Sequence, residues 1–422
     1  MKMSFGAFFV LLCHWVSFGQ SSPYILTLEQ AVQAALENNP RYLEAKYEVA
    51  ASKASYWSAI SLPQPSFEIS YNFVPQGAGL SQYDENNIGV SQSFDFPTLY
   101  FLRASVADYT TDQKINRLEL VRNKLIHKVK QSYNKLLMLK YKVMFTEQIL
   151  SVAQELHTKI ERKTILGESS KLESLTASVQ YTEAENNLAI ANNDLQLAKA
   201  ELINILGPEK FKNPGILLAD SLYVDASPLD FSELLDAVNK TNPQIREANV
   251  LKELAATEKK ISWHSLLPAF TLSWYKQSRG GNTNFYGASL GLSFPLWFMF
   301  ENRGKIAEAT AKYSIAEEQV RTLNNDLVLQ LEEAYAIFKN ADKQKALYSN
   351  TLIPQSQTVF EIALKSYIEG EASYLDFLQA NRLLHETRNG YIQSILNQIS
   401  AALTLEELSS ITMVKTRQQE LK

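Results

Sequence analysis

The chain has 422 residues, which is enough for two or three ordinary domains with a sizeable hydrophobic core. Charged residues make up 20% and hydrophobic residues 45%, a balance that excludes a largely disordered chain and a polytopic helical membrane protein. The 41 basic and 45 acidic residues give a formal net charge of −4, so we expect no nucleic-acid partner.

The first 19 residues have the pattern of a signal peptide. Lys2 supplies the positive start, residues 5–12 form a short apolar run, and Ser17-Phe18-Gly19 is a small-x-small cleavage site. No other stretch approaches eighteen consecutive apolar residues, so we expect export without a helical membrane anchor. The only cysteine, Cys13, follows Leu12 rather than a small residue, which disfavours lipidation and leaves it open.

The rest of the chain contains an internal sequence repeat, with an offset of 203 residues between the two copies. LTLEQAVQAALENNP at 26–40 returns as LDFSELLDAVNKTNP at 229–243. Both copies predict a capping box, from Thr27 in the first and Asp230 in the second, followed by an Asn-Pro helix start. We therefore divide the chain into a first repeat (20–206), a linker with at most one short strand (207–228), a second repeat (229–410) and a tail (411–422).

Each repeat contains two short segments in which apolar and polar residues alternate strictly, as in a half-buried strand. They span 65–73 and 88–97 in the first repeat, and 268–276 and 286–295 in the second. Glycines between the two segments of each pair predict β-hairpins.

Very long helical sequences follow both hairpins. No proline or glycine occurs from 101 to 166, and the second copy runs from about 304 to 369 with an expected kink at Pro354. Helical sequence then resumes to about residues 206 and 408, and small residues recur every seven positions in these last helices. This spacing predicts coiled-coil packing. The alanines and their counterparts are Ala177, Ala184, Ala191, Ala198, Ala380, Thr387, Ser394 and Ala401.

The apolar strand faces need something to cover them, and no further strand-rich segment is available to form an opposing sheet. An exported chain with strands of about ten residues fits the wall of a transmembrane β-barrel. Four strands cannot close a barrel, so other copies of the chain must complete it. The residues that we expect to face lipid are Phe67, Ile69, Tyr71, Phe73, Phe270, Leu272, Trp274, Leu290 and Leu292.

The duplicated plan, the Phe-Pro pairs that end strands and the motif Tyr367, Gly370, Asp376, Leu378 resemble the TolC family of outer-membrane efflux proteins. The resemblance covers nearly the whole mature chain. It implies a fold that is mainly α with a small β part, assembled as a homotrimer with a transmembrane β-barrel and a periplasmic helical tunnel. It also implies outer-membrane lipid, a periplasmic adaptor and an inner-membrane pump as partners, for efflux or type I secretion in a Gram-negative bacterium.

The same resemblance assigns residues to the tunnel entrance. It places the helix breaks at Gly167 and Gly370 at the periplasmic tip. It makes Asp376, Gln379, Glu173, Glu371 and Glu168 the candidates for the entrance or gate. Asp376 would form a ring of carboxylates, and Glu173 would tie the closed tip. The alternative is that these acids are merely solvated charges at a turn.

We expect neither enzyme activity nor a cofactor or metal, because no titratable cluster converges in the sequence. The S-x-x-K pattern at Ser132 and Lys135 lies inside a long helix without companion motifs. The rival to the channel is a periplasmic coiled-coil scaffold or adaptor that is not inserted in the outer membrane. The sequence leaves the cargo and the class of pump open.

Overall fold

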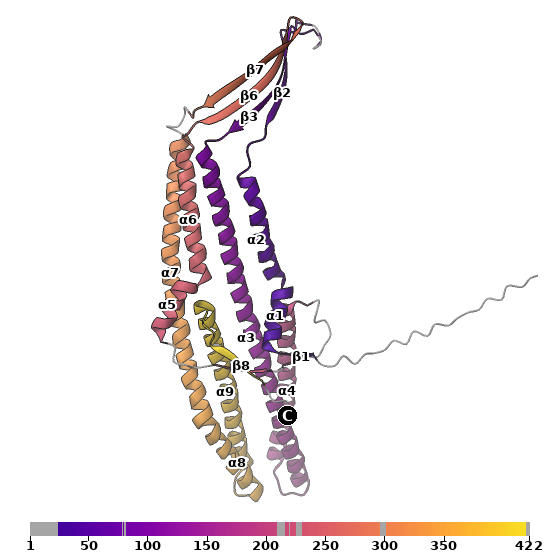
Figure 1. Ribbon diagram of the computed structural model, residues 1–422. Coiled ribbons are helices and arrows are strands. Elements are labelled where there is room, and N and C mark those ends of the chain that lie inside the picture. Colours follow the sequence, from indigo (N-terminus) through magenta and orange to yellow (C-terminus); the bar gives the residue numbers. More distant parts are fainter. Residues whose placement is uncertain are drawn as a thin grey trace, which may run out of the picture.

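The computed structural model describes residues 24–77, 79, 82–208, 216–218, 220–224, 230–295 and 301–418. The predicted signal peptide and Cys13 lie outside these residues. The molecule is elongated, with a β-sheet at one end and two helical tips at the other (Figure 1). The expected fold class, mainly α with a small β part, is confirmed.

The two repeats share one order of elements: a pair of short helices, a β-hairpin and then long helices. In the first, the elements are β1 (Tyr24–Leu26), α1 (Leu28–Asn38), α2 (Pro40–Ala59), β2 (Ser66–Asn72), β3 (Glu85–Phe94), α3 (Pro97–Ile165) and α4 (Lys171–Leu206). In the second, they are α5 (Phe231–Thr241), α6 (Pro243–His264), β6 (Ala269–Arg279), β7 (Asn282–Ser293), α7 (Glu301–Leu347), the π-helix η1 (Tyr348–Leu352), α8 (Ile353–Glu369) and α9 (Tyr374–Ser409). The linker contains β4 (Ile216–Leu218) and β5 (Asp220–Val224), and the tail contains β8 (Val414–Gln418).

Capping at the start of each repeat differs from the expectation in one copy. Thr27 forms the predicted capping box with Gln30 at the start of α1. Asp230 makes no side-chain cap hydrogen bond on α5, so that expectation is wrong. The Asp230 carboxylate accepts instead from the hydroxyl of Ser232, 2.8 Å away. Asn39 and Asn242 cap α2 and α6, each with proline at the first helical position.

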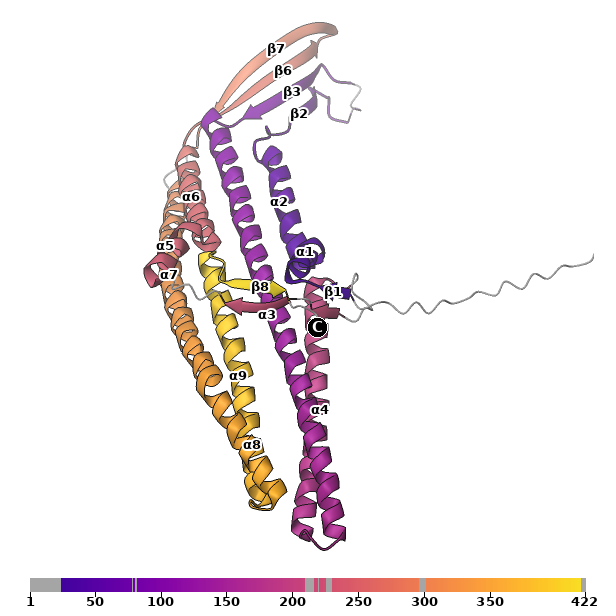
Figure 2. The same ribbon diagram turned by 60° about the horizontal axis from the view of Figure 1, so that its bottom comes forward.

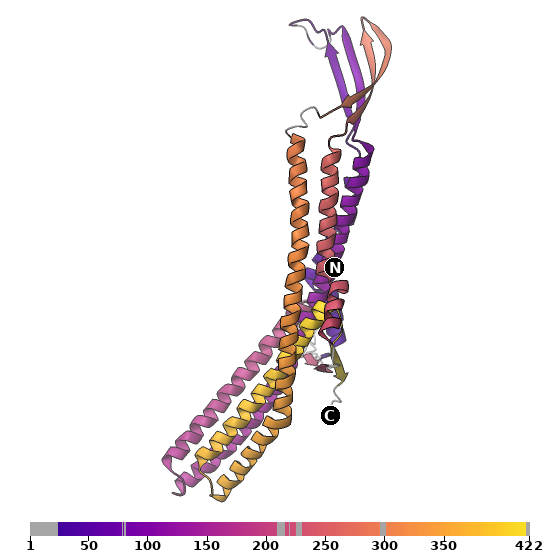
Figure 3. The ribbon, with the colours of Figure 1, turned by 90° about the vertical axis from the view of Figure 1, so that its left-hand side faces the viewer.

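The long helices of the two repeats are not equally continuous. Helix α3 runs for 69 residues without a break, about 100 Å at 1.5 Å per residue. Its counterpart is interrupted by η1, with Pro354 in the first turn of α8. Proline lacks an N–H to donate to the preceding turn, and this favours the local change in helix type. Figure 3 shows the lower part of the bundle running at an angle to the upper part.

The heptad positions lie where the sequence predicts. Ala177, Ala184, Ala191 and Ala198 are all buried along α4, and α4 packs along α3. Small side chains permit this close approach of two helices. The main hydrophobic core lies at mid-length, where α1, α3, α4, α5, α7 and α9 contribute buried side chains around Tyr133. Among the described helices, none is long and apolar enough to cross a membrane.

The linker contains two short strands, which corrects the expectation of at most one. Strand β4 pairs in parallel with β1, and β5 pairs antiparallel with β8 from the C-terminal tail. Figure 2 shows β8 beside the long helices at mid-length. Glu406 on α9 accepts from the backbone N–H groups of Met413 and Val414 and pairs with Lys130 of α3. Segments distant in sequence supply these partners, so local patterns did not reveal the strands.

Candidate functional site

The sheet at the end of the molecule combines the hairpins of both repeats. Its strand order is β2-β3-β6-β7, and every neighbouring pair is antiparallel. The hairpins meet between β3 and β6, where Phe94 is opposite Phe270 and Glu85 is opposite Arg279. Gly280 and Gly281 have φ angles of 54° and 83°, which lets them form the tight turn between β6 and β7. Strands β2 and β7 are the two edges of this sheet.

One face of the sheet is apolar and exposed. Residues opposite each other in an antiparallel register share a face, so the pairs Phe67–Val90, Val90–Trp274 and Leu272–Leu290 define one continuous surface. Eight of the nine residues expected to face lipid lie on it. Phe73 does not belong to a strand, because β2 ends at Asn72 and Phe73 has a φ of 56°. Leu290 is 69% exposed and Trp274 is 52% exposed, so no part of the described chain covers this face.

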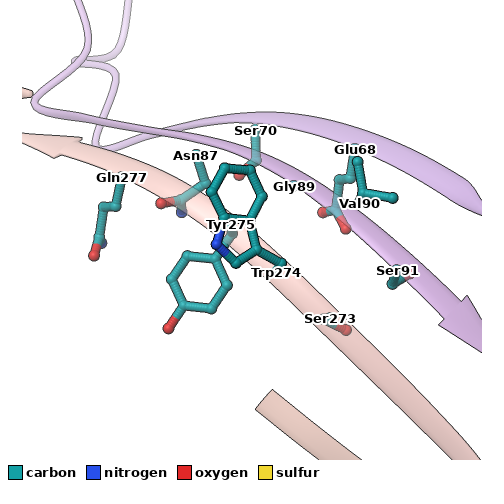
Figure 4. A pocket seen from close by; sticks show the side chains of 10 residues that line it. All are labelled: Glu68, Ser70, Asn87, Gly89, Val90, Ser91, Ser273, Trp274, Tyr275 and Gln277. Atoms are coloured by element: carbon teal, nitrogen blue, oxygen red, sulfur yellow. The ribbon is translucent and has the colours of Figure 1, made fainter. Parts of the chain in front are cut away.

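The other face is polar and contains a hollow of about 330 Å³ (Figure 4). Hydroxyl and amide groups tie its strands together, as in the hydrogen bond of 2.6 Å between Ser66 and Ser91. The amides of Asn72 and Asn87 both donate to the carboxylate of Glu85. Opposed apolar and polar faces are typical of the wall of an outer-membrane barrel.

The opposite end of the molecule consists of two helical turns. Helix α3 ends just before Gly167, and α8 ends at Gly370, with φ angles of 78° and 79° at the two glycines. A side chain at these angles would be strained, so glycine suits both turns. The break positions expected from sequence are therefore the positions where these helices end.

Glu173 connects the two repeats at this end. Its carboxylate accepts from the hydroxyl of Tyr367 on α8 at 2.9 Å and from Ser169 at 2.6 Å. The Tyr367 ring lies 5.5 Å from that of Tyr374, centroid to centroid, and both contact Phe377. Burial, followed by the nearby Glu173 carboxylate, raises the pKa of Tyr374 to about 12. Burial and the Glu173 hydrogen bond likewise raise the pKa of Tyr367.

Asp376 has a structural role that the sequence analysis missed. Its carboxylate accepts from the backbone N–H and the hydroxyl of Ser373, which completes a capping box at the start of α9. These hydrogen bonds lower the pKa of Asp376 and keep it ionised. The S-x-x-D spacing from Ser373 to Asp376 was the available signal.

The remaining candidates for the entrance stay exposed. Glu168 and Glu371 lie on the surface at the two turns, and Gln379 lies on the surface near the start of α9. Within the described residues, no three His, Cys, Asp or Glu side chains are grouped so that they could hold a metal ion. The structure thus brings Glu173 into a contact between the repeats and leaves the other four candidates exposed.

Both turns also present the same pair of apolar residues. Ile165 and Leu172 flank the first turn, and Ile368 and Leu375 flank the second at an offset of 203 residues. Their exposed fractions range from 61% to 79%. An apolar pair that is repeated and exposed at both turns is typical of a docking surface.

Comparisons with known proteins agree with this architecture. A family model described as "Outer membrane efflux protein" matches residues 31–208 and 234–409, one stretch in each repeat. The cobalt-zinc-cadmium resistance protein CzcC of Cupriavidus metallidurans is 22% identical over 390 residues, covering 91% of this chain and 90% of CzcC. The pyoverdine export outer membrane protein OpmQ of Pseudomonas putida is 22% identical over 407 residues, covering 90% and 84%.

Solved structures show the same fold. The open state of the MtrE outer membrane channel of Neisseria gonorrhoeae superimposes with a TM-score of 0.76 at 16% identity. The match covers 90% of this chain and 88% of MtrE. The resemblance inferred from the repeats and the strand faces is thereby confirmed.

Proposed function

The chain belongs to the outer membrane efflux protein family and is an efflux channel subunit, and from this premise we propose that three copies assemble into one exit duct. The duct would serve a tripartite efflux or type I secretion system, with a periplasmic adaptor and an inner-membrane pump as partners. The observation that carries the proposal is a two-faced sheet at the end of helices about 100 Å long. CzcC and OpmQ are named for different cargoes, so the proposal covers the duct and leaves its cargo unassigned.

The edge strands support assembly from several copies. In lipid, the unpaired backbone groups of β2 and β7 would each cost several kcal/mol, and closure of a barrel removes both edges. Four strands from each of three copies would give about twelve, within the range of outer-membrane barrels. Strand β7 of one copy would then pair with β2 of the next.

The exposed residues of the two turns support docking of the adaptor. Two turns in each of three copies would place six pairs of an isoleucine and a leucine at the periplasmic end of the duct. Burying such side chains against a partner is favourable by roughly 25 cal/mol per Å². We expect the double variant Ile165→Ser/Ile368→Ser to lose co-purification with the adaptor and to conduct normally alone. Retained co-purification would rule out this docking surface.

The charged entrance is part of the same proposal. Three copies of Asp376 would place three carboxylates near the narrow end and favour cations over anions. In planar bilayers, Asp376→Asn should reduce the preference for cations while the channel still opens. Unchanged selectivity would remove Asp376 from the entrance, and its capping box would then be its whole role.

The decisive experiment separates the channel from the periplasmic scaffold. The mature protein should fractionate with the outer membrane, resist carbonate extraction and form a trimer in detergent by native mass spectrometry. The purified trimer should conduct ions in planar bilayers. A freely soluble monomer without conductance would reject the channel and favour the scaffold.

A further inference from the structure

The polar face of the sheet contains one row of residues with an unusual composition. The registers place Glu68 of β2 opposite Gly89 of β3, Gly89 opposite Tyr275 of β6, and Tyr275 opposite Gly287 of β7. Across the four strands, a residue with a large side chain thus alternates with a glycine. Strands lie about 4.8 Å apart, so Glu68 and Tyr275 stand about 10 Å from each other across a floor of bare backbone.

Tyr275 leans away from this gap, toward Gly287. A Cβ atom built on Gly287 would lie 2.3 Å from Cζ of the Tyr275 ring, so the ring covers this glycine. On the other side, the atoms nearest to a Cβ atom on Gly89 would be Cβ and Cα of Tyr275 and the backbone oxygen of Trp274, at 3.3 to 3.9 Å. The ring therefore forms one wall of the hollow, and Gly89 leaves its floor open. Figure 4 shows Tyr275 and Glu68 at different sides of this hollow.

Glu68 supplies the charge of the hollow. Of the other acids of the two hairpins, Glu85 accepts from two asparagine amides and Asp95 pairs with Arg103 at 2.7 Å, while Asp84 does not line the hollow. Glu68 makes no hydrogen bond or ion pair within the described residues, and its side chain is exposed. The hydroxyls of Ser70 and Ser273 line the same hollow and can accept further hydrogen bonds.

We propose that Glu68, Gly89 and Tyr275 form a site on the inner wall of the channel that binds organic ammonium ions. The carboxylate pairs with the ammonium group, the serine hydroxyls accept its remaining N–H bonds, and the ring of Tyr275 contacts the apolar part of the ligand. A metal ion fits less well, because the hollow offers one carboxylate and no second acid or histidine. This inference rests on the proposed function, since only a closed barrel places the polar face inside a pore.

The trimer would contain three such sites at the same level of the barrel, and they would bind cations that pass through the channel. Bound organic ammonium would occupy part of the lumen and reduce the current carried by small ions. We expect the binding to be weak, because each site is open to water and salt screens the attraction between the carboxylate and the ammonium group.

The experiment measures single-channel current in planar bilayers with phenethylammonium as the probe. The wild-type channel should be blocked in a concentration-dependent manner, and phenethyl alcohol, which lacks the charge, should not block. Glu68→Gln should raise the half-blocking concentration about tenfold, which corresponds to about 1.4 kcal/mol. Tyr275→Leu should raise it as well, whereas Tyr275→Phe should retain the block because the ring remains.

Glu317→Gln is the matched control, since Glu317 is an exposed acid on α7, far from the sheet. This variant should be blocked like the wild type.

Equal block of the wild type and Glu68→Gln would overturn the site, as would block by phenethyl alcohol at the same concentration. Block by Mg²⁺ at lower concentration than phenethylammonium would make it a metal-ion site instead. A wild-type protein that never conducts would overturn the proposed function itself, and the ammonium site with it.

Discussion

At the scale of single residues, the contact between Tyr367 and Glu173 is the clearest link between the repeats at the tip. The two side chains are 194 residues apart in sequence and 2.9 Å apart in space. A hydrogen bond to a charged group contributes roughly 1.5–3 kcal/mol. We propose that this bond holds the two turns together in a closed channel and breaks when the tip opens.

We expect Tyr367→Phe to open the channel more often. The substitution keeps the ring contacts with Tyr374 and Phe377 but removes the hydroxyl that donates to Glu173. A loss of about 1.4 kcal/mol would change the ratio of open to closed channels about tenfold. Single-channel recordings give this ratio directly. Tyr47→Phe is the control, because Tyr47 is 70% exposed on α2. An unchanged ratio in Tyr367→Phe would contradict this role of the Tyr367–Glu173 hydrogen bond.

The same cluster predicts a response to alkaline pH. Burial and Glu173 raise the pKa of Tyr374 to about 12, against an ordinary value of 10.0. A raised pKa means that the folded tip binds the proton more tightly, so the stabilisation is complete below pH 10 and is lost as pH rises to about 12. Open probability should therefore increase over this interval. The double variant Tyr367→Phe/Tyr374→Phe should show a flat profile, and a wild-type profile that is equally flat would exclude this role.

At the scale of elements, His385 of α9 packs against α3. The centroids of the His385 and Phe145 rings are 5.5 Å apart. The Arg388 guanidinium lies 4.5 Å from the centroid of the Phe145 ring. Arg388 also donates to Gln357 of α8 at 2.8 Å, so three helices meet here. Burial, followed by the charge of Arg388, lowers the pKa of His385 to about 4.

This lowered pKa predicts that acid loosens the three-helix contact. Folding favours the neutral imidazole, so the stabilisation is present above the ordinary pKa of 6.5 and is lost as pH falls through about 4. The loss is at most about 3 kcal/mol at 1.36 kcal/mol for each pH unit. His385→Gln should flatten the decrease in the thermal unfolding midpoint between pH 7 and pH 4. His264→Gln should retain the decrease, and the same slope in both variants would refute this source of acid sensitivity.

The second repeat differs from the first in the continuity of its long helix. Helix α3 is continuous, while η1 divides α7 from α8 next to Pro354. The Tyr348 side chain lies against Gly390 of α9. A Cβ atom added to Gly390 would be only 2.4 Å from the hydroxyl oxygen of Tyr348. π-Helical turns are found mostly as single-turn interruptions of α-helices and are places where helices kink, so the long helix of the second repeat is interrupted here while α3 is not.

At the scale of the whole molecule, the two faces of the sheet predict different solvents for neighbouring residues. Trp274 lies on the apolar face and Tyr275 on the polar face of the same strand. In a variant whose only tryptophan is Trp274, lipids with brominated acyl chains should quench most of the fluorescence. Moving that tryptophan one position, with Trp274→Phe and Tyr275→Trp, should remove the quenching. Equal quenching at both positions would show that the sheet does not separate lipid from water.

The sequence by itself determined the duplicated plan, the strand faces and the coiled-coil seams. These features repeat with a short period, and the period follows from backbone geometry: two residues for a strand and about 3.5 for supercoiled helices. Glycine at the turns was equally readable, because only glycine accepts a φ near 80° without strain.

Only the tertiary structure decided which distant residues meet. It paired β5 with β8, brought the Tyr367 hydroxyl to the Glu173 carboxylate, and set Glu68 across an open floor from Tyr275. Such contacts depend on how the two repeats are rotated and shifted against each other. No local period encodes that placement, since it is the result of packing over the full length of the helices.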